Sequence, residues 1–492
     1  MMDLIFYNLA ILVVFLLFII LWIRSRRPIG YPPGPTTIPV IGNMHNIAKG
    51  HVLETFRELR TKYGDIFSLS IGQFWVIVVN GTENLRELLV KNGEHTSDRP
   101  PFYLMKLLNN KGIVSSSGSN WKHQRSFALA KLRGFGFGKR SFENRIMEEI
   151  EAFLELLGSY KREPFDLTGI LNTSMANNVM SITIGRRFDY DDPEFVRFIE
   201  ILNDLASNPS LAGPVNFVPS LSKIPGDPFR ITPITKKMDM LFDYFRKQIK
   251  EHKETIDDCN IRDFTDAYIK EMKKDETFNS TPYYSEDQLV SILVDLFAAG
   301  AETTATTIRW TVLYLIHNVD IQNKMWKEID NVVGVGRLPS LSDRPNLPYC
   351  EAVILESFRL GNIVPLSLPH LVTGDVKCQG YTIPKGSVIF PCLDSVALDE
   401  KIFPNSHDFQ PERFIDTDGK VYNQDKVLTF SLGRRVCLGE SLARIELFLY
   451  LTTLVQRFAF LPPEGEGPPP IEAILATTNG PKPYKVRAIP RS

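Results

Sequence analysis

The spacing of hydrophobic and polar positions changes several times along this 492-residue chain. Near its start, Leu4 to Ile23 form an almost unbroken apolar run, LIFYNLAILVVFLLFIILWI, which is long enough to cross a bilayer as a helix. Arg24, Arg26 and Arg27 follow this run, so the positive-inside rule places the rest of the chain on the cytoplasmic side. Because the run has no small-residue cleavage site, it predicts an uncleaved single-pass anchor over residues 1–27.

A different pattern follows the anchor. Residues 28–45 are rich in proline and predict a stiff, extended linker. Residues 67–72 and 75–81 then predict two strands that are joined by a turn. Elsewhere, apolar positions recur mostly with the helical period of 3.6 residues, as they do over 141–154. We therefore expect a mainly α fold with small β-sheets, in one large domain over residues 46–492.

The longest predicted helix begins at the capping box Ser285–Gln288 (SEDQ) and runs to about His317. Midway lies Ala299–Thr304 (AGAETT), in which the glycine and the threonines are poor helix formers. A threonine hydroxyl can also compete for backbone carbonyls. We expect a locally opened turn here, with the acid Glu302 and the alcohol Thr303 side by side. From the residues alone, a buried polar patch that only packs is an equal alternative.

The amino-acid composition indicates a globular protein and excludes one class of partner. Hydrophobic residues make up 43% and charged residues 23% of the chain, with a formal net charge of −1, which is typical of a globular protein. No basic excess is present to bind a phosphate backbone, so nucleic acid is excluded as a partner. The cysteines are odd in number and scattered, without a C-x-x-C pair, and predict reduced thiols. They are Cys259, Cys350, Cys378, Cys392 and Cys437.

One cysteine stands in a special setting. Cys437 belongs to the run FSLGRRVCLG and directly precedes a predicted helix, where free backbone N–H groups favour a thiolate. Such a thiolate is a ligand for a soft or borderline metal, including haem iron. Gly433 would let the backbone turn tightly beneath a flat cofactor, and Arg435 is a rigid donor for a propionate. Gly439 would let the new helix approach the ring, while Phe430 would shield the sulfur from water.

This run resembles the haem-thiolate signature of cytochrome P-450 monooxygenases. Other motifs of that family occur in the same order, namely W-x-x-x-R at 121–125, A-G-x-E-T at 299–303, E-x-x-R at 356–359 and P-E-R-F at 411–414. The resemblance implies the cytochrome P-450 fold, with a single haem domain behind the N-terminal anchor. It also implies haem b as the cofactor and Cys437 as its iron ligand.

The resemblance assigns further roles residue by residue. Besides Arg435, the implied ligands of the haem propionates are Trp121, Arg125, His370 and Arg99. A structural Glu-Arg-Arg network that would fix the Cys437 loop is implied for Glu356, Arg359 and Arg413.

The same comparison gives the implied catalytic groups. Glu302 and Thr303 would relay protons for oxygen activation on the distal side of the haem. Positions that correspond to the family's substrate pocket are Val114, Ser115, Asp295, Ala299, Val364, Leu368 and Thr478. Their mixed character does not select a substrate.

The expected function is insertion of one oxygen atom from O₂ into an apolar xenobiotic, steroid or fatty acid. The resemblance is to the animal microsomal, family 2-like branch, which implies the endoplasmic reticulum membrane with a cytoplasmic haem domain. It further implies electrons from NADPH-cytochrome P-450 reductase, with cytochrome b5 as an optional partner. A haem-thiolate isomerase or peroxide-dependent enzyme is one alternative, and it would not need the pair Glu302 and Thr303. A non-enzymatic haem-binding or electron-transfer protein is another.

Overall fold

The computed structural model describes residues 7–8, 12, 15–16, 19, 22–23, 26–39, 41–47, 51–137, 142–206, 208, 213–278 and 283–491. The predicted anchor, Leu4–Ile23, falls largely outside these residues. Among the described residues, α12 (Glu286–His317) is the helix that is long and apolar enough to cross a membrane. However, 67% of its most apolar window is buried inside the protein, as in the core helix of a globular fold.

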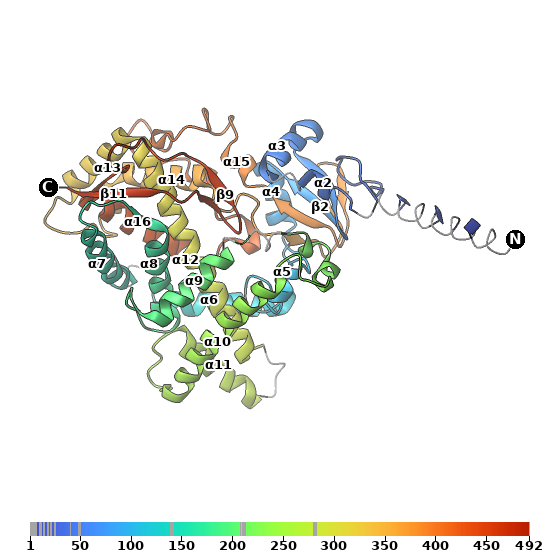
Figure 1. The fold of residues 1–492 in the computed structure, drawn as a ribbon, viewed down its shortest axis with the longest axis horizontal. Coiled ribbons are helices and arrows are strands. Elements are labelled where there is room, and N and C mark those ends of the chain that lie inside the picture. Colours follow the sequence, from blue (N-terminus) through green and yellow to red (C-terminus); the bar gives the residue numbers. More distant parts are fainter. Residues whose placement is uncertain are drawn as a thin grey trace.

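Helices dominate the structure, and the prediction of a mainly α fold with small sheets is confirmed (Figure 1). The helices besides α12 are α2 (Met44–Ile47), α3 (Val52–Tyr63), α4 (Thr82–Arg86), α5 (Tyr103–Leu107), α6 (Gly118–Gly134), α7 (Glu143–Ser159), α8 (Leu167–Thr183), α9 (Pro193–Ala206), α10 (Ile231–Thr255), α11 (Phe264–Phe278), α13 (Val319–Val332), α14 (Pro348–Gly361), α15 (Asp394–Ala397) and α16 (Glu440–Arg457).

Within the part of the chain that the structure describes, the strands form four small sheets. They are β1 (Ile66–Ile71), β2 (Phe74–Val79), β3 (Phe165–Asp166), β4 (His370–Leu371), β5 (Val376–Cys378), β6 (Tyr381–Ile383), β7 (Val388–Pro391), β8 (Phe458–Leu461), β9 (Ala473–Leu475), β10 (Asn479–Pro481) and β11 (Lys485–Pro490). The largest sheet has the order β1-β2-β7-β4, and the other sheets pair β3-β11-β8, β5-β6 and β9-β10. The two strands predicted near residues 67–81 are therefore present as β1 and β2, each displaced by one residue at its start.

The four-stranded sheet is covered on both faces. Ile77 and Val79 of β2 belong to one hydrophobic core, whereas Val76 and Val78 belong to another. Successive side chains of a strand point to opposite faces, so a strand buried on both faces is apolar at nearly every position. Figure 1 shows this sheet with α3 and α4 on one side of the molecule, while α7, α8 and α16 lie on the other.

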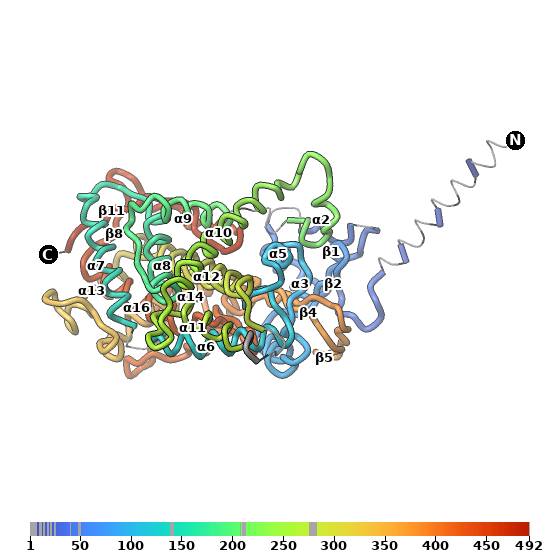
Figure 2. Tube along the Cα trace, turned by 90° about the horizontal axis from the view of Figure 1, so that it is seen from below, coloured from blue at the N-terminus to red at the C-terminus, as the bar shows by residue number. Residues whose placement is uncertain are grey.

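Helix α12 runs through the middle of the molecule and packs against α8, α10, α14 and α16 (Figures 1 and 2). Ser285 caps it as predicted, because its Oγ accepts the N–H of Gln288 at 3.2 Å. The locally opened turn predicted over Ala299–Thr304 is wrong, since the helix is continuous there. The physical reason is that the Thr303 hydroxyl donates to the Ala299 carbonyl oxygen at 2.6 Å, one turn back, and so bonds within the helix instead of breaking it.

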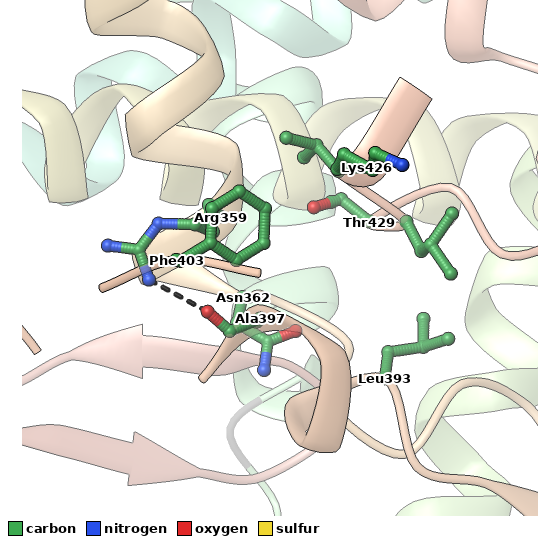
Figure 3. Close-up of a pocket in the computed structure, with 9 residues that line it drawn as sticks. Arg359, Asn362, Leu393, Ala397, Phe403, Lys426 and Thr429 are labelled. Carbon is green, nitrogen blue, oxygen red and sulfur yellow. Dashed lines mark hydrogen bonds between the residues drawn. The ribbon is translucent and has the colours of Figure 1, made fainter. Parts of the chain in front are cut away.

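The predicted ion-pair network of Glu356, Arg359 and Arg413 is present in the structure. Arg359 Nε lies 2.7 Å from Glu356 Oε2, and Arg413 Nε lies 3.0 Å from Glu356 Oε1. Remaining donors of the two arginines bond to backbone carbonyls between Ala397 and Gln410, which pins this segment. Figure 3 shows the Arg359 guanidinium directed at the Ala397 carbonyl. Removing one partner of a buried pair typically costs about 3–5 kcal/mol, because the other charge is left uncompensated.

The connection from this network to the Cys437 loop is indirect. The hydroxyl of Thr429, which lies in the same pocket in Figure 3, donates to the Phe358 carbonyl of α14 at 2.8 Å. The ring of Phe358 also packs edge-on against Phe430, with centroids 5.0 Å apart. Helix α14 therefore holds the start of the loop, while its charged side chains hold the preceding segment.

Candidate active site

Cys437 lies in the turn between the short 3-10 helix Gly433–Arg435 and α16. Its backbone N–H donates to the Phe430 carbonyl at 2.9 Å and closes the loop. Gly433 has φ +75°, and a Cβ atom there would lie 1.9 Å from the carbonyl oxygen of Leu89. The tight turn predicted at Gly433 is present, but the neighbour that requires glycine is the chain itself rather than a cofactor.

The roles expected of Gly439, which would let the helix approach the ring, and of Phe430, which would shield the sulfur, stay predictions. A Cβ atom on Gly439 would lie 3.8 Å from Cys437 Sγ, which is an ordinary contact, and the φ of Gly439 is −86°. Phe430 packs against Phe358, and Cys437 remains exposed. The described residues therefore leave one side of the sulfur open.

Helix position alone does not make Cys437 a thiolate. Burial raises the pKa of the Cys437 thiol, and the backbone N–H groups of Gly439 and Glu440 only partly oppose this effect. The helix start therefore favours the thiolate as expected, but burial outweighs it and the net shift of the thiol pKa is upward. The Cys437 side chain nevertheless remains accessible.

The middle of α12 borders open space as well. Most of its residues are buried, yet Ala299 is exposed and Thr303 is half-buried, and these two residues share one face of the helix. Leu368, in the loop before β4, is 38% exposed. Ala299 and Leu368 therefore remain accessible, although the helices around α12 bury most of its surface.

Two buried arginines, Arg435 and Arg99, and the half-buried Arg125 bond to backbone carbonyls near Cys437 and Leu368. Arg435 donates to the carbonyl oxygens of Ser97, Ile113 and Ser116 at 2.6–2.8 Å. Arg99 donates to the carbonyls of Val114, Leu368 and Pro369 at 2.7–3.2 Å, and Arg125 donates to the carbonyl of Val436. Among the described residues, no carboxylate lies within ion-pair distance of these three guanidinium groups. Backbone carbonyls hold the charges in place without neutralising them.

This cluster is electrostatically unbalanced. Burial, followed by repulsion from Arg99, lowers the pKa of Arg435 to about 8, and burial with repulsion from Arg125 lowers that of Arg99 to about 10. Burial and the nearby Arg99 lower the pKa of His370 to about 3, so this imidazole is neutral. Its Nδ1 lies 2.6 Å from the Thr96 carbonyl oxygen.

The donor set fits a dianionic ligand. The indole Nε1 of Trp121 is buried and has no hydrogen-bond partner among the described residues, and the Arg435 guanidinium lies 4.0 Å above the Trp121 ring. A buried N–H of this kind is costly to leave unpaired. Two carboxylates, such as the propionates of haem b, would satisfy it and would neutralise the arginines. Because Cys437 would supply a sulfur ligand for the iron, the residues present fit haem.

The acid and the alcohol of α12 are separated. Two hydroxyls donate to Glu302 Oε1, that of Thr306 at 2.8 Å and that of Thr478 at 2.7 Å. Thr303 instead bonds to Ala299, because adjacent helical positions diverge by about 100°. The expectation that Glu302 and Thr303 lie side by side is therefore wrong. Burial raises the pKa of Glu302, and the hydrogen bond from Thr478 is the largest opposing influence.

Two of the predicted pocket residues make structural bonds. Asp295 Oδ2 accepts the backbone N–H groups of Ile113 and Val114 at 2.6 and 2.9 Å, and burial raises the pKa of Asp295 to about 7. Ser115 is 3% exposed, and its hydroxyl donates to Lys111. Asp295 therefore links α12 to the loop that Arg435 and Arg99 also hold. Contact of either residue with a substrate stays a prediction, as it does for Val114, Ala299, Val364, Leu368 and Thr478.

The sequence motifs did not point to Thr306 and Glu446 as residues near the site. Thr306 follows Glu302 by four positions, so helical spacing could have found it. Glu446 is a lone acid in the apolar face of α16, and it is 1% exposed. Its Oε2 accepts the hydroxyl of Thr304 at 3.3 Å, and burial raises the pKa of Glu446 to about 8. This contact ties the helix that follows Cys437 to α12.

A second cluster of ligand-type atoms is an ion-pair network rather than a metal centre. In the described parts of the chain, His252, Asp263 and Asp266 are the group whose ligand atoms lie within 4.8 Å of one another. However, Arg262 donates to both oxygens of Asp266, at 2.6 and 2.8 Å, and His252 lies 3.0 Å from Asp263. Their charges are already paired.

Comparison with known proteins agrees with this site. Residues 32–488 match the family model described as Cytochrome P450. The chain is 37% identical over 491 residues to Cytochrome P450 2D6 of Pan paniscus, which covers 98% of each chain. It is 38% identical over 480 residues to Cytochrome P450 2H1 of Gallus gallus, which covers 96% of each chain. The chain therefore belongs to the cytochrome P450 family, whose members bind haem b and act as monooxygenases.

Proposed function

We propose that this protein takes two electrons from NADPH through a separate reductase and inserts one atom of O₂ into an apolar organic molecule. The overall reaction converts a substrate C–H bond, O₂, NADPH and a proton into a C–OH bond, water and NADP⁺. Support comes above all from the buried, uncompensated arginine cluster beside the open face of Cys437. NADPH-cytochrome P450 reductase is the proposed donor, with cytochrome b5 as an optional second one.

The residues divide into those that hold the cofactor and those that serve the reaction. Bound haem would supply the activation of dioxygen. Cys437 Sγ would bind the haem iron, and because burial raises the pKa of its thiol, a metal cation is needed to favour the thiolate. Arg99, Arg125 and Arg435, with Trp121 and His370, are the proposed propionate partners.

The proposed substrate is an apolar xenobiotic, steroid or fatty acid. Ala299 and Leu368 are the exposed positions among the candidate pocket residues, and Val114 and Val364 are half-buried. These four side chains carry no hydrogen-bonding group, so they favour an apolar ligand and would exclude water from it.

Glu302 and Thr303 are the proposed proton carriers. The Thr303 hydroxyl donates to Ala299 and keeps its lone pairs free to accept a hydrogen bond on the open face of α12. Glu302 is a half-buried acid whose raised pKa brings it closer to the working pH, where a relay group is most effective. Because the two side chains diverge, at least one water must join them.

We further propose an endoplasmic reticulum location with the haem domain in the cytoplasm, on the charge asymmetry around Leu4–Ile23. The native sequons at Asn80 and Asn172 cannot report orientation, because both asparagines are buried. Asp418 and Lys420 flank Gly419 in an exposed loop, so Asp418→Asn with Lys420→Thr creates an accessible sequon. We expect no glycosylation of this variant, whereas replacing the anchor by a cleaved signal peptide should yield it. A glycosidase-sensitive mass shift in the anchored variant would reverse the proposed orientation.

Replacing Cys437 should remove the thiolate signature of the haem. In Cys437→Ala we expect the ferrous carbonyl complex to lose the red-shifted Soret band that thiolate ligation produces. The matched control is Cys259→Ala, since Cys259 is exposed and lies in a surface loop. The assignment of Cys437 is wrong if its alanine variant keeps the shifted band.

Replacing the relay groups should uncouple NADPH use from product formation. Positioned proton transfer typically contributes 10²–10⁴-fold, so product per NADPH should fall by about two decades in Thr303→Ala and in Glu302→Gln, with peroxide released instead. Haem content and substrate binding should persist. Thr311→Ala is the control, because Thr311 makes the same bond to the carbonyl four residues back, at Thr307. Parental yield in both relay variants would favour the peroxide-dependent or isomerase alternative.

A further inference from the structure

Glu302 is held from outside its own helix. Thr478, which is 7% exposed, lies in the turn between β9 and β10 and donates its hydroxyl to Glu302 Oε1 at 2.7 Å. Thr306 donates to the same oxygen from one turn along α12. One oxygen of the proposed relay acid is therefore bonded to two elements that are remote from each other in sequence.

The β9–β10 turn is tied to elements around the proposed substrate site. The backbone N–H of Thr477 donates to the carbonyl of Ala206 at 3.2 Å, at the end of α9. The backbone N–H of Asn479 donates to Ile363 at 2.8 Å, just after α14. A displacement of either element would move the turn and, with it, the hydroxyl of Thr478.

The same turn also lies along α12. Trp310 Nε1 donates to the Asn479 carbonyl at 2.8 Å, and Arg309 Nη2 donates to the Pro481 carbonyl at 3.0 Å. The Arg309 charge also stabilises ionised Glu302. The hairpin therefore covers a polar stripe of α12 that is formed by Glu302, Thr306 and Arg309.

We propose that Thr478 is a positioning residue for Glu302, and that through it the β9–β10 turn controls proton delivery. The proposal rests on the relay function of Glu302 proposed above. A hydroxyl that donates to a carboxylate stabilises its ionised form and fixes its direction. Burial acts on Glu302 in the opposite sense, so the hydroxyls of Thr478 and Thr306 limit how far its pKa rises.

The sign of the effect follows from this balance. Removal of the Thr478 hydroxyl leaves burial less opposed, so the pKa of Glu302 must rise further. A hydrogen bond to a charged group corresponds to a shift of about one pH unit. Below the new pKa, Glu302 would stay protonated and could no longer accept the protons that it must pass on.

The direct test is a titration of Glu302 in the haem-loaded enzyme. The infrared band of its carboxyl group is identified by its absence in Glu302→Gln. In Thr478→Val, which keeps the shape but loses the donor, we expect the midpoint to move up by about one pH unit. Thr478→Ser should restore the parental midpoint. Thr477→Val is the matched control, because Thr477 is exposed in the same turn and bonds through its backbone.

The yield of product per NADPH should follow the titration of Glu302. The pH profile of product per NADPH should shift up by about one unit in Thr478→Val and return to the parental profile in Thr478→Ser. If Thr478→Val does not fold, Thr306→Val removes the second donor and should shift both midpoints in the same direction. Equal infrared midpoints and pH profiles in Thr478→Val, Thr478→Ser and the parent would overturn the proposal.

Failure of the relay would look different. In that case Glu302→Gln would keep the parental yield, while the infrared titration would still report whether Thr478 bonds to Glu302. Control of proton delivery would then be excluded together with the relay. If Glu302→Gln lost yield while Thr478→Val kept the parental infrared midpoint and pH profile, only the role of the β9–β10 turn would be excluded.

Discussion

The site depends on the cost of burying Arg99 and Arg435 without a carboxylate partner among the described residues. A buried charge costs several kcal/mol unless it is paired and hydrogen-bonded. Here the acceptors are carbonyls from three segments, around Ser97, over 113–116 and at 368–369. Because the planar donors of an arginine have fixed directions, these segments must converge on the two side chains. In the proposed site a dianionic cofactor would supply the missing charge, which would link cofactor binding to the shape of these loops.

Helix α12 carries residues for both the proposed oxygen chemistry and the proposed proton supply. One part of its surface, at Ala299 and Thr303, is accessible, as Cys437 is. Another part carries Glu302 and lies against the β9–β10 turn. At the start of this region Asp295 fixes the loop over 113–116 through backbone N–H groups. The helix therefore connects oxygen chemistry, proton supply and the cofactor loops through hydrogen bonds of ordinary length.

Local patterns predicted the elements and the chemical types at the site, because they depend on neighbours in sequence. The Ser285 cap, the strands β1 and β2 and the pairing of Glu356 with Arg359 are of this kind. Contacts between distant segments were not predictable in the same way. The sequence predicts that Gly433 makes room for a cofactor, whereas the structure places the backbone of Leu89 against it. The sequence predicts that Asp295 lines the pocket, whereas its carboxylate accepts hydrogen bonds from the backbone of residues 113–114. The prediction of an opened turn in α12 was wrong, because helix propensity does not show which atom the Thr303 hydroxyl bonds to.

The central claim is that the arginine cluster exists to hold two carboxylates of the cofactor. The most direct measurement compares the affinity of the apoprotein for haem with its affinity for haem dimethyl ester, in which both propionates are neutral. Charge-assisted hydrogen bonds contribute about 1.5–3 kcal/mol each, so the ester should bind at least about a hundredfold more weakly. In Arg435→Met with Arg99→Met, this preference for the free acid should largely disappear. Equal affinity of the parent protein for haem and for its diester would contradict the account.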